Sequence, residues 1–139
     1  MNPSLLDTDT LSEVLKRRNP IVLTNASNYL RQCQQFAFSA ITRYEVRRGY
    51  LSRRAAARLH RFAVFCQHSI VFPVTDDVLD QAALLWADAR GRSLPSNDAD
   101  LVIAATALLH DRTLVTGNTA HFRWISGLTL DDWRTPVVP

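Results

Sequence analysis

Residues 5–9 read Leu5-Leu6-Asp7-Thr8-Asp9, a short apolar run that stops at a carboxylate. A buried strand has this pattern where it reaches the edge of its sheet, so we predict a first β-strand here. Further short apolar runs occupy residues 36–39, 70–72, 113–116 and 128–130. The segments between the runs have helical spacing. Short apolar strands that alternate with helices predict an α/β fold, with a central, mainly parallel sheet of four to five strands flanked by helices.

The helices expected between these strands have recognisable starts and ends. Asp9 is the expected cap of the first helix, Pro20 opens the second at its first turn, and Thr75 caps a later helix that ends near Gly91. The predicted segments are 10–17, 20–31, a helix from about 42, 51–62, 75–91, and one that starts at 97 or 98 and runs to 108.

Length and composition exclude several classes of protein. The chain has 139 residues, of which 47% are hydrophobic, so we expect one domain spanning residues 1–139. No apolar run approaches the roughly 20 residues that span a bilayer, and the N-terminus does not resemble a signal peptide. The two cysteines, Cys33 and Cys66, form no CxxC pair, which excludes a zinc knuckle or a disulfide framework. We expect a cytoplasmic protein without a membrane contact.

The basic residues are almost all arginines. The net charge is +3, the isoelectric point is near 9.3, and Lys16 is the only lysine among 16 basic residues. Arginine suits bidentate recognition of phosphate or carboxylate, although high-GC coding bias produces the same skew. Residues 43–61 contain seven arginines and one acid, Glu45. This window is compatible with a phosphate track, a solvated helix face or a contact to an acidic partner.

Carboxylate and amide side chains occur where the strands end. These residues are Asp7, Glu45, Asp98, Asp100 and Asn118. Ligand sites of parallel sheets lie beyond the carboxyl ends of the strands. Two carboxylates 4 Å apart repel by about 4 kcal/mol at an effective dielectric constant near 20, so gathered acids favour a bound cation. Oxygen ligands suit Mg²⁺ or Mn²⁺, and these ions assist phosphodiester hydrolysis.

Each of these acids also has a purely structural interpretation. Thr42 and Glu45 match the capping box, in which the glutamate bonds the backbone at the helix start. Asp98 and Asp100 lie about 200° apart around a helix, so they are not expected to face one site. Asp7 has no capping need unless a helix begins there.

Taken together, the motifs resemble the PIN-domain nucleases, and within them the VapC family of toxin–antitoxin ribonucleases. The likeness extends in order over nearly the whole chain. It rests on residues 5–9, on Ser39 to Gly49, on Gly91-Arg92-Ser93-Leu94-Pro95, on Asp100 to Ala107, on Leu114 to Phe122, on Gly127-Leu128 and on Asp132-Trp133.

The resemblance implies roles for individual residues. Asp7, Glu45, Asp100 and Asn118 would form the catalytic site, with Asp7 and Asp100 as the principal ligands of Mg²⁺, or of Mn²⁺ in its place. Glu45 would orient a water or act as a base. Asn118 would hold a metal-bound water.

Two positions depart from the family pattern. Asp9 stands where Asn is commoner, and Asn118 stands where many PIN domains carry a fourth Asp, so Asp98 and Asp9 are candidate additional acids. Candidate substrate-binding residues are Arg43, Arg47 and Thr116.

The resemblance also implies a substrate and partners. The chain would be an Mg²⁺-dependent endoribonuclease that cuts single-stranded or loop regions of RNA. Its partner would be a VapB-like antitoxin, and the chain would form a homodimer within a larger toxin–antitoxin assembly. Operator DNA would be bound only through the antitoxin.

Two other functions compete with this one. A catalytically silent PIN-like module would bind RNA or a partner without cutting it. A haloacid-dehalogenase-like phosphohydrolase would use Asp7 as nucleophile, since Leu6-Asp7-Thr8-Asp9-Thr10 has the two aspartates of the DxDxT motif at the right spacing. That enzyme also needs a downstream basic residue and a GDxxxD-type metal motif, and the sequence has no Gly-Asp pair.

Overall fold

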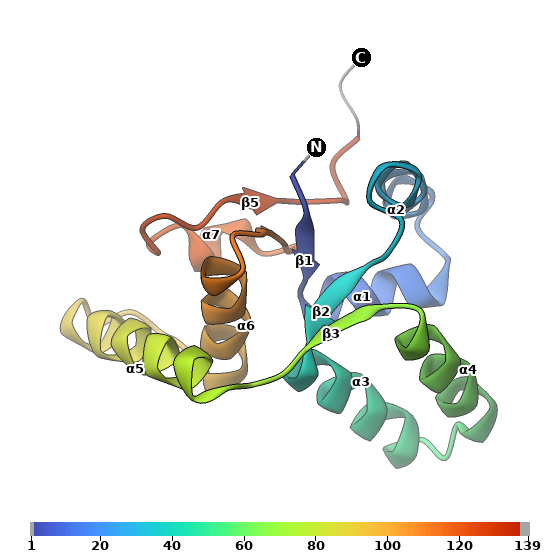
Figure 1. The fold of residues 1–139 in the computed structure, drawn as a ribbon, viewed down its shortest axis with the longest axis horizontal. Coiled ribbons are helices and arrows are strands. Elements are labelled where there is room, and N and C mark those ends of the chain that lie inside the picture. The colour runs from blue at the N-terminus through green and yellow to red at the C-terminus, as the bar shows by residue number, and fades with distance from the viewer. Residues whose placement is uncertain (1, 137–139) are drawn as a thin grey trace.

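The structure is a computed structural model, and it describes residues 2–136. Five strands and seven helices form within these residues, and Figure 1 shows their arrangement. In chain order they are β1 (Ser4–Leu6), α1 (Thr8–Lys16), α2 (Pro20–Cys33), β2 (Ala37–Ser39), α3 (Ala40–Ser52), α4 (Ala56–Gln67), β3 (Ile70–Phe72), α5 (Asp76–Gly91), α6 (Asp98–Leu109), β4 (Thr113–Val115), α7 (Thr119–Phe122) and β5 (Leu130–Asp131).

All strand pairs are parallel, which confirms the predicted mainly parallel α/β architecture. Hydrogen bonds join β1 to β4 and β4 to β5, while β2 pairs with β3. Strands β1 and β2 also lie beside each other. Leu6 is opposite Val115, and Ser39 is opposite Phe72, so the strands of each pair end together. Residues that follow β1 and β4 are therefore neighbours although they are more than 100 positions apart in the chain.

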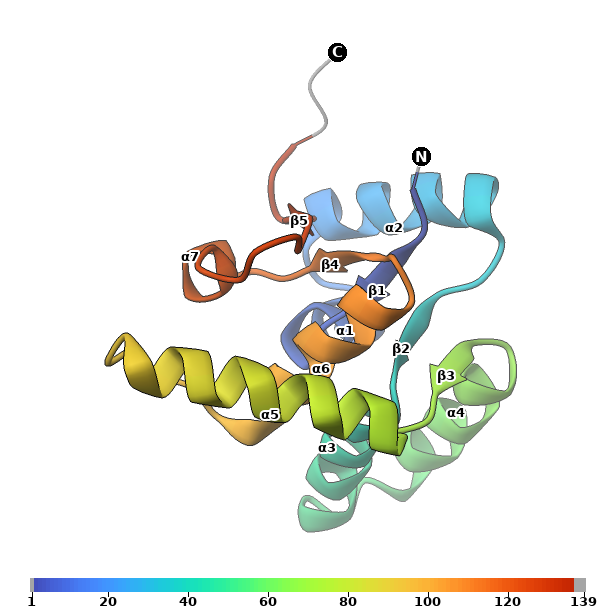
Figure 2. The same ribbon diagram turned by 60° about the vertical axis from the view of Figure 1, so that its left-hand side comes forward.

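Helices cover both faces of the strands (Figures 1 and 2). Leu5 packs with Leu114 and the buried residues of α5 and α6, whereas Leu6 packs with Val115 and buried residues of α1, α2 and α4. Successive residues of a strand point to opposite faces, so an apolar run of this kind is buried on both sides. None of the described helices is long and apolar enough to cross a membrane.

The predicted single helix over residues 51–62 is wrong. Helix α3 ends at Ser52 and α4 begins at Ala56. Between them Arg54 adopts the left-handed conformation, with φ of 54°, and the Ala55 N–H donates to the carbonyl of Tyr50 at 2.9 Å. A left-handed residue and a hydrogen bond that spans it form a common cap at the C-terminal end of a helix, and the left-handed residue is usually glycine. The apolar spacing continues across the turn, so periodicity alone does not reveal the break.

The hydroxyl of Tyr29 secures the start of β1. Tyr29 is 1% exposed, and its oxygen accepts the backbone N–H of Ser4 at 2.9 Å. Its ring lies 5.5 Å from that of Trp133, measured between centroids. The contact thus links α2 to the first strand and to the segment that follows β5.

We predict that Tyr29→Phe lowers the free energy of unfolding by about 1–3 kcal/mol, because the buried N–H of Ser4 loses its partner. Urea denaturation would measure the change. Tyr44→Phe is the matched control, since Tyr44 is 54% exposed and its loss of a hydroxyl should change stability by no more than about 0.5 kcal/mol. Equal effects of the two substitutions would contradict the assigned role of Tyr29.

Candidate functional site

Asp7 stands at the junction of β1 and α1. Its N–H continues the strand pairing by donating to the carbonyl of Val115 at 3.0 Å, and its carboxylate accepts the N–H of Thr10 at 2.8 Å. Asp7 is therefore the N-cap of α1, and the predicted cap, Asp9, is wrong: Asp9 lies exposed in the first turn. The error arose because the helix begins directly after the strand, without a loop residue.

The Asp7 carboxyl group is in an unfavourable environment for a charge. Burial raises its pKa above the ordinary value of 3.8, and hydrogen bonds from the Thr116 hydroxyl and from Thr10 oppose the rise. Within residues 2–136, no basic side chain lies within 4 Å of it. Desolvation without a compensating cation disfavours the ionised form, so a positive ligand near Asp7 would stabilise the folded protein.

Glu45 reaches the same region from α3. The N-cap of this helix is Ser39, whose hydroxyl accepts the N–H of Ile41, so the capping box of Thr42 and Glu45 is wrong. Glu45 lies past the first turn and accepts a hydrogen bond from the Thr8 hydroxyl at 2.7 Å. Its other oxygen pairs with Arg48 at 3.5 Å. The contact to Thr8 holds Glu45 beside the residue that follows Asp7.

Asp100 and Asp98 both lie in the first turn of α6, but their surroundings differ. Asn97 caps this helix by accepting the Asp100 N–H at 2.9 Å, and its amide donates to the Asp100 carboxylate at 2.8 Å. The same carboxylate oxygen lies 3.1 Å from Nε2 of His121. Asp98 is exposed and makes no side-chain contact of this kind within residues 2–136. The expectation that the two aspartates face different ways is consistent with this arrangement.

Thr116 connects the halves of the site. Its side chain is completely buried, donates to Asp7, and accepts the N–H of Asn118 at 3.1 Å. The carbonyl of Asn118 in turn accepts the N–H of His121 at 3.1 Å, and His121 contacts Asp100. One polar network therefore runs along the carboxyl ends of β1 and β4. Thr116 positions its neighbours in this network and has no exposed surface to offer a substrate.

The Asn118 side chain lies at the surface of the protein. Asn118 is exposed at the start of α7 and makes no side-chain capping bond to that helix. Arg43 and Arg47 are exposed on α3, and Arg43 contacts the thiol of Cys66. The structure therefore places these two arginines on the helix that carries Glu45, outside the polar network itself.

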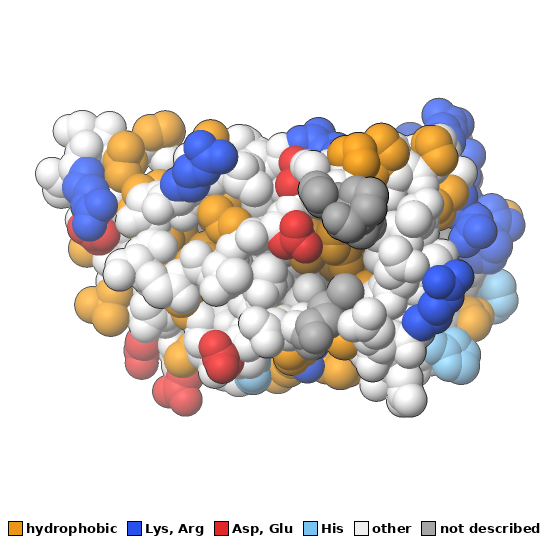
Figure 3. All heavy atoms as spheres, turned by 90° about the horizontal axis from the view of Figure 1, so that it is seen from above, with side chains coloured by type: hydrophobic (Ala, Val, Ile, Leu, Met, Phe, Trp, Pro, Cys, Tyr) orange, Lys and Arg blue, Asp and Glu red, His pale blue; other side chains and the backbone are white. Residues whose placement is uncertain are grey.

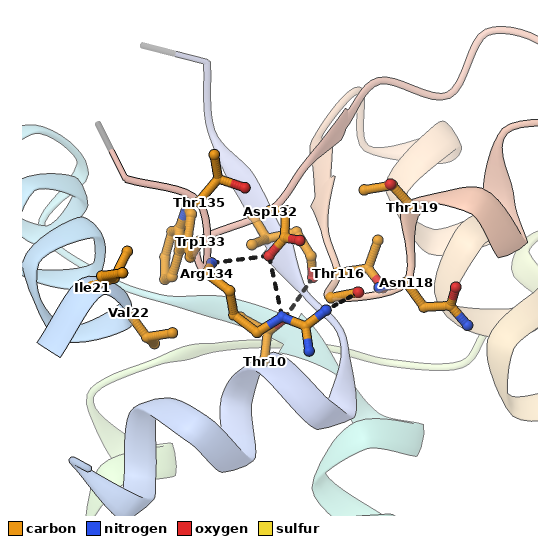
Figure 4. A network of polar contacts seen from close by, with 12 residues as sticks. Thr10, Ile21, Val22, Thr116, Asn118, Thr119, Asp132, Trp133, Arg134 and Thr135 are labelled. Atoms are coloured by element: carbon orange, nitrogen blue, oxygen red, sulfur yellow. Dashed lines mark hydrogen bonds and ion pairs between the residues drawn. The ribbon is translucent and has the colours of Figure 1, made fainter. Parts of the chain in front are cut away.

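Sequence reasoning missed Arg134, which lies against this network. Figure 4 shows its side chain extending from the segment after β5 toward the loop after β4. The guanidinium donates to the carbonyl of Gly117, while the Arg134 N–H is held by Asp132 at 2.9 Å. A Cβ at position 117 would collide with the guanidinium. Arg134, Gly117 and Asp9 line one small cavity of about 70 Å³, so the chain itself places a cation at the acidic edge.

The donor chemistry fits a hard divalent cation, since the available ligands are carboxylate and amide oxygens. Within residues 2–136, no three His, Cys, Asp or Glu side chains lie close enough to enclose an ion. Mg²⁺ usually keeps several waters and binds through one or two carboxylates, so an enclosing cage is not required. Asp7 and Asp100 are the residues that fit this role.

A larger hollow in the described surface lies elsewhere. It has a volume of about 530 Å³ and is lined by Ser4 and Thr113, which begin β1 and β4, and by side chains of α2. On the face from which the described ends of the chain emerge, basic side chains lie mainly toward the left, top and right, and acidic ones lie near the centre and toward the lower left (Figure 3). None of the residues of the polar network lines this hollow, so its size does not make it the candidate site.

We predict that Asp7→Asn raises the free energy of unfolding at pH 7 in metal-free buffer. Asn caps a helix about as well as Asp, while the costly charge is removed. Because the pKa of Asp7 is raised in the folded protein, its ionisation costs stability as the pH rises above 3.8. The gain should therefore disappear as the pH falls below that value, which urea denaturation across pH would show.

Asp7→Ala is the control, because it removes both the charge and the cap. It should be less stable than Asp7→Asn by about 1 kcal/mol at every pH. If Asp7→Asn were as destabilising as Asp7→Ala at pH 7, the carboxylate would be a structural cap that an amide cannot replace.

Comparisons with known proteins agree with this architecture. The family model of the PIN domain matches residues 4–127. VapBC2 from Rickettsia felis, solved with a promoter DNA fragment, is 20% identical, with a TM-score of 0.83, and the match covers 94% of this chain and 98% of that one. DNA-bound VapBC from Salmonella typhimurium is 22% identical, with a TM-score of 0.83 and coverage of 96% and 99%.

FitAcB from Neisseria gonorrhoeae is 25% identical, with a TM-score of 0.75 and coverage of 93% and 96%. No curated protein matches the chain. The family model spans most of the chain, and the structure has the parallel strands that the sequence predicted. The chain therefore belongs to the PIN domain family.

Proposed function

We propose that this chain is a metal-dependent endoribonuclease and the toxin of a VapC-type toxin–antitoxin pair. The observation that carries the proposal is the buried Asp7 carboxylate, which has no basic partner within residues 2–136 and is joined through Thr116 to the segment that reaches Asp100. Carboxylates at such an edge are costly unless they bind a cation. The similar solved structures include a member of the VapBC family of toxin–antitoxin systems, from Mycobacterium tuberculosis.

Asp7 and Asp100 would hold Mg²⁺ or Mn²⁺. When bound, the ion would activate water and neutralise charge on the phosphodiester. His121 and Asn97 orient the Asp100 carboxylate, and Thr116 and Thr10 orient that of Asp7.

The remaining residues of the site would act on water and on the substrate. Glu45, fixed by Thr8, would accept a proton from an attacking water or orient it. The exposed amide of Asn118 would position a water or a phosphate oxygen. Arg134 would offer its guanidinium to the phosphate, which arginine binds in bidentate fashion. The site thus combines proton acceptors with a cation within one edge of the sheet.

The observations do not favour the phosphohydrolase alternative. In that mechanism Asp7 would be the nucleophile and a GDxxxD-type motif would bind the metal, whereas the sequence has no Gly-Asp pair. The chain also has the fold of the PIN domain family, and the DxDxT mechanism depends on a different fold.

We further propose that an antitoxin and a second copy of the chain are its partners, within a larger assembly that reaches operator DNA through the antitoxin. Two of the similar VapBC structures are bound to DNA. Apolar side chains on α5 support a partner surface, since Leu79 is 47% and Trp86 is 45% exposed and they are seven positions apart on one helix face.

We predict that the purified chain cleaves single-stranded RNA with Mg²⁺ or Mn²⁺ and loses this activity with a chelator. Asp100→Asn should lower the cleavage rate by about 100-fold, the upper end of the range for loss of a mere outer-shell partner, because it removes the charge of a direct ligand. Asp76→Asn, which removes an exposed acid from the first turn of α5, should leave the rate unchanged. Gel analysis of a labelled RNA would measure these rates.

Calorimetric titration with each ion provides the second readout. Binding by the wild-type chain, weakened in Asp100→Asn, would support the assignment. Absence of both cleavage and ion binding would instead identify a silent binding module.

A further inference from the structure

A basic hollow lies between α1, α3 and the start of α4. Its volume is about 270 Å³, and four cationic side chains line it: Lys16, Arg18, Arg53 and Arg58. We refer to it as the basic hollow. Its cations come from the end of α1, from the residue that caps the end of α3 and from α4, so the fold brings together charges that are separated in the sequence.

Most of these cations are not neutralised by the protein. Lys16 pairs with Glu13 at 3.8 Å. Within residues 2–136, no carboxylate lies within 4 Å of Arg18, Arg53 or Arg58. Like charges that converge on one cavity repel one another, and an anion in the cavity relieves this repulsion. Arginines in particular favour phosphate, through planar bidentate bonds.

The basic hollow adjoins the candidate active site. Thr8 and Glu45 line it, and these are the two residues whose 2.7 Å hydrogen bond lies beside Asp7. A strand whose reacting bond lies at the acidic edge would therefore place its next phosphates among the arginines. An acidic peptide could pair with the same arginines, but nothing in the hollow would direct one end of it to Glu45.

We infer that the basic hollow binds the phosphodiester backbone of single-stranded RNA next to the bond that is cut. This inference rests on the proposed function, whose site it extends. Of the seven arginines in the 43–61 window, Arg53 and Arg58 line the hollow, and Lys16 and Arg18 join them from outside the window. The structure thus favours the phosphate track over a solvated helix face for these residues.

The test measures RNA binding without cleavage. The probe is a fluorescent single-stranded RNA of mixed sequence, titrated in chelator at several salt concentrations. Arg53→Gln and Arg58→Gln should each weaken binding by about three- to tenfold and make the slope of log affinity against log salt shallower by about 0.7, the value for one lost phosphate contact. Arg90→Gln, on α5, removes the same charge outside the hollow and should change neither quantity.

A second pair of variants compares a neutral and an acidic side chain at one position of the hollow. The space beside Gly49 accepts a Cβ, which would lie 3.7 Å from the Arg53 guanidinium, an ordinary contact. Gly49→Ala should therefore bind RNA normally, whereas Gly49→Glu should bind far more weakly because it neutralises Arg53. Thermal unfolding would establish that both variants are folded.

The outcomes separate this inference from the proposed function. If the wild-type chain cleaves RNA while the hollow variants bind it normally, the inference is wrong and the nuclease assignment stands. If the wild-type chain cleaves nothing but RNA binding falls in the variants, the hollow is confirmed and the nuclease assignment fails. An oligo-glutamate peptide that binds through Arg53 and Arg58, with RNA binding unaffected, would overturn the inference in favour of an acidic protein partner.

Discussion

The pairing of β1 with β4 places the candidate site, and Asp7 is the residue in which this pairing meets the helix that follows. Its N–H completes the strand ladder on Val115, and its carboxylate starts α1 by accepting from Thr10. A residue with both duties has to lie at the buried end of the strand, where ionisation is costly. The unfavourable burial of the Asp7 carboxylate is thus a consequence of the fold. The same position brings Asp7 against Thr116, through which Asn118 and His121 are held in place.

Much of the fold is predictable from local pattern, because β1, β2 and β4 are short, largely apolar runs that are almost entirely buried. The predicted strand 70–72 coincides with β3, and Thr75 caps α5 as expected. The errors have a common physical origin. The break near Arg54 depends on one left-handed residue that is not glycine, and the apolar spacing continues across it. The caps assigned to Asp9 and Thr42 were wrong because α1 and α3 start directly after their strands, so Asp7 and Ser39 serve both elements.

The residues of the candidate site also differ in how far the sequence predicts them. Asp7 and Asp100 are marked in the sequence by their place beside a strand end and a helix start. Their partners are not, since the contact of Asp100 with His121 spans 21 positions and that of Glu45 with Thr8 spans 37. Arg134 and Arg18 belong to no motif, and only tertiary packing brings Arg134 to the loop after β4 and Arg18 to the basic hollow. Local patterns therefore identify which acids gather, while tertiary structure decides which cations face them.

This separation of charge would allow a chain with a net charge of only +3 to act on a polyanion, as the proposed function requires. Carboxylates that activate water also repel the phosphate that has to approach them, and the repulsion is strong where water is excluded. The cost falls when cations flank the acids without neutralising them. Arg134 lies on one side, over Gly117, and the basic hollow lies on the other, beyond Glu45. Were the same arginines paired directly with Asp7 or Asp100, those carboxylates would bind a metal ion less well and the phosphate would meet a neutral surface. Cations that lie near Asp7 and Asp100 without pairing with them are therefore the arrangement that such a site requires; Arg134 pairs instead with Asp132, at 3.5 Å.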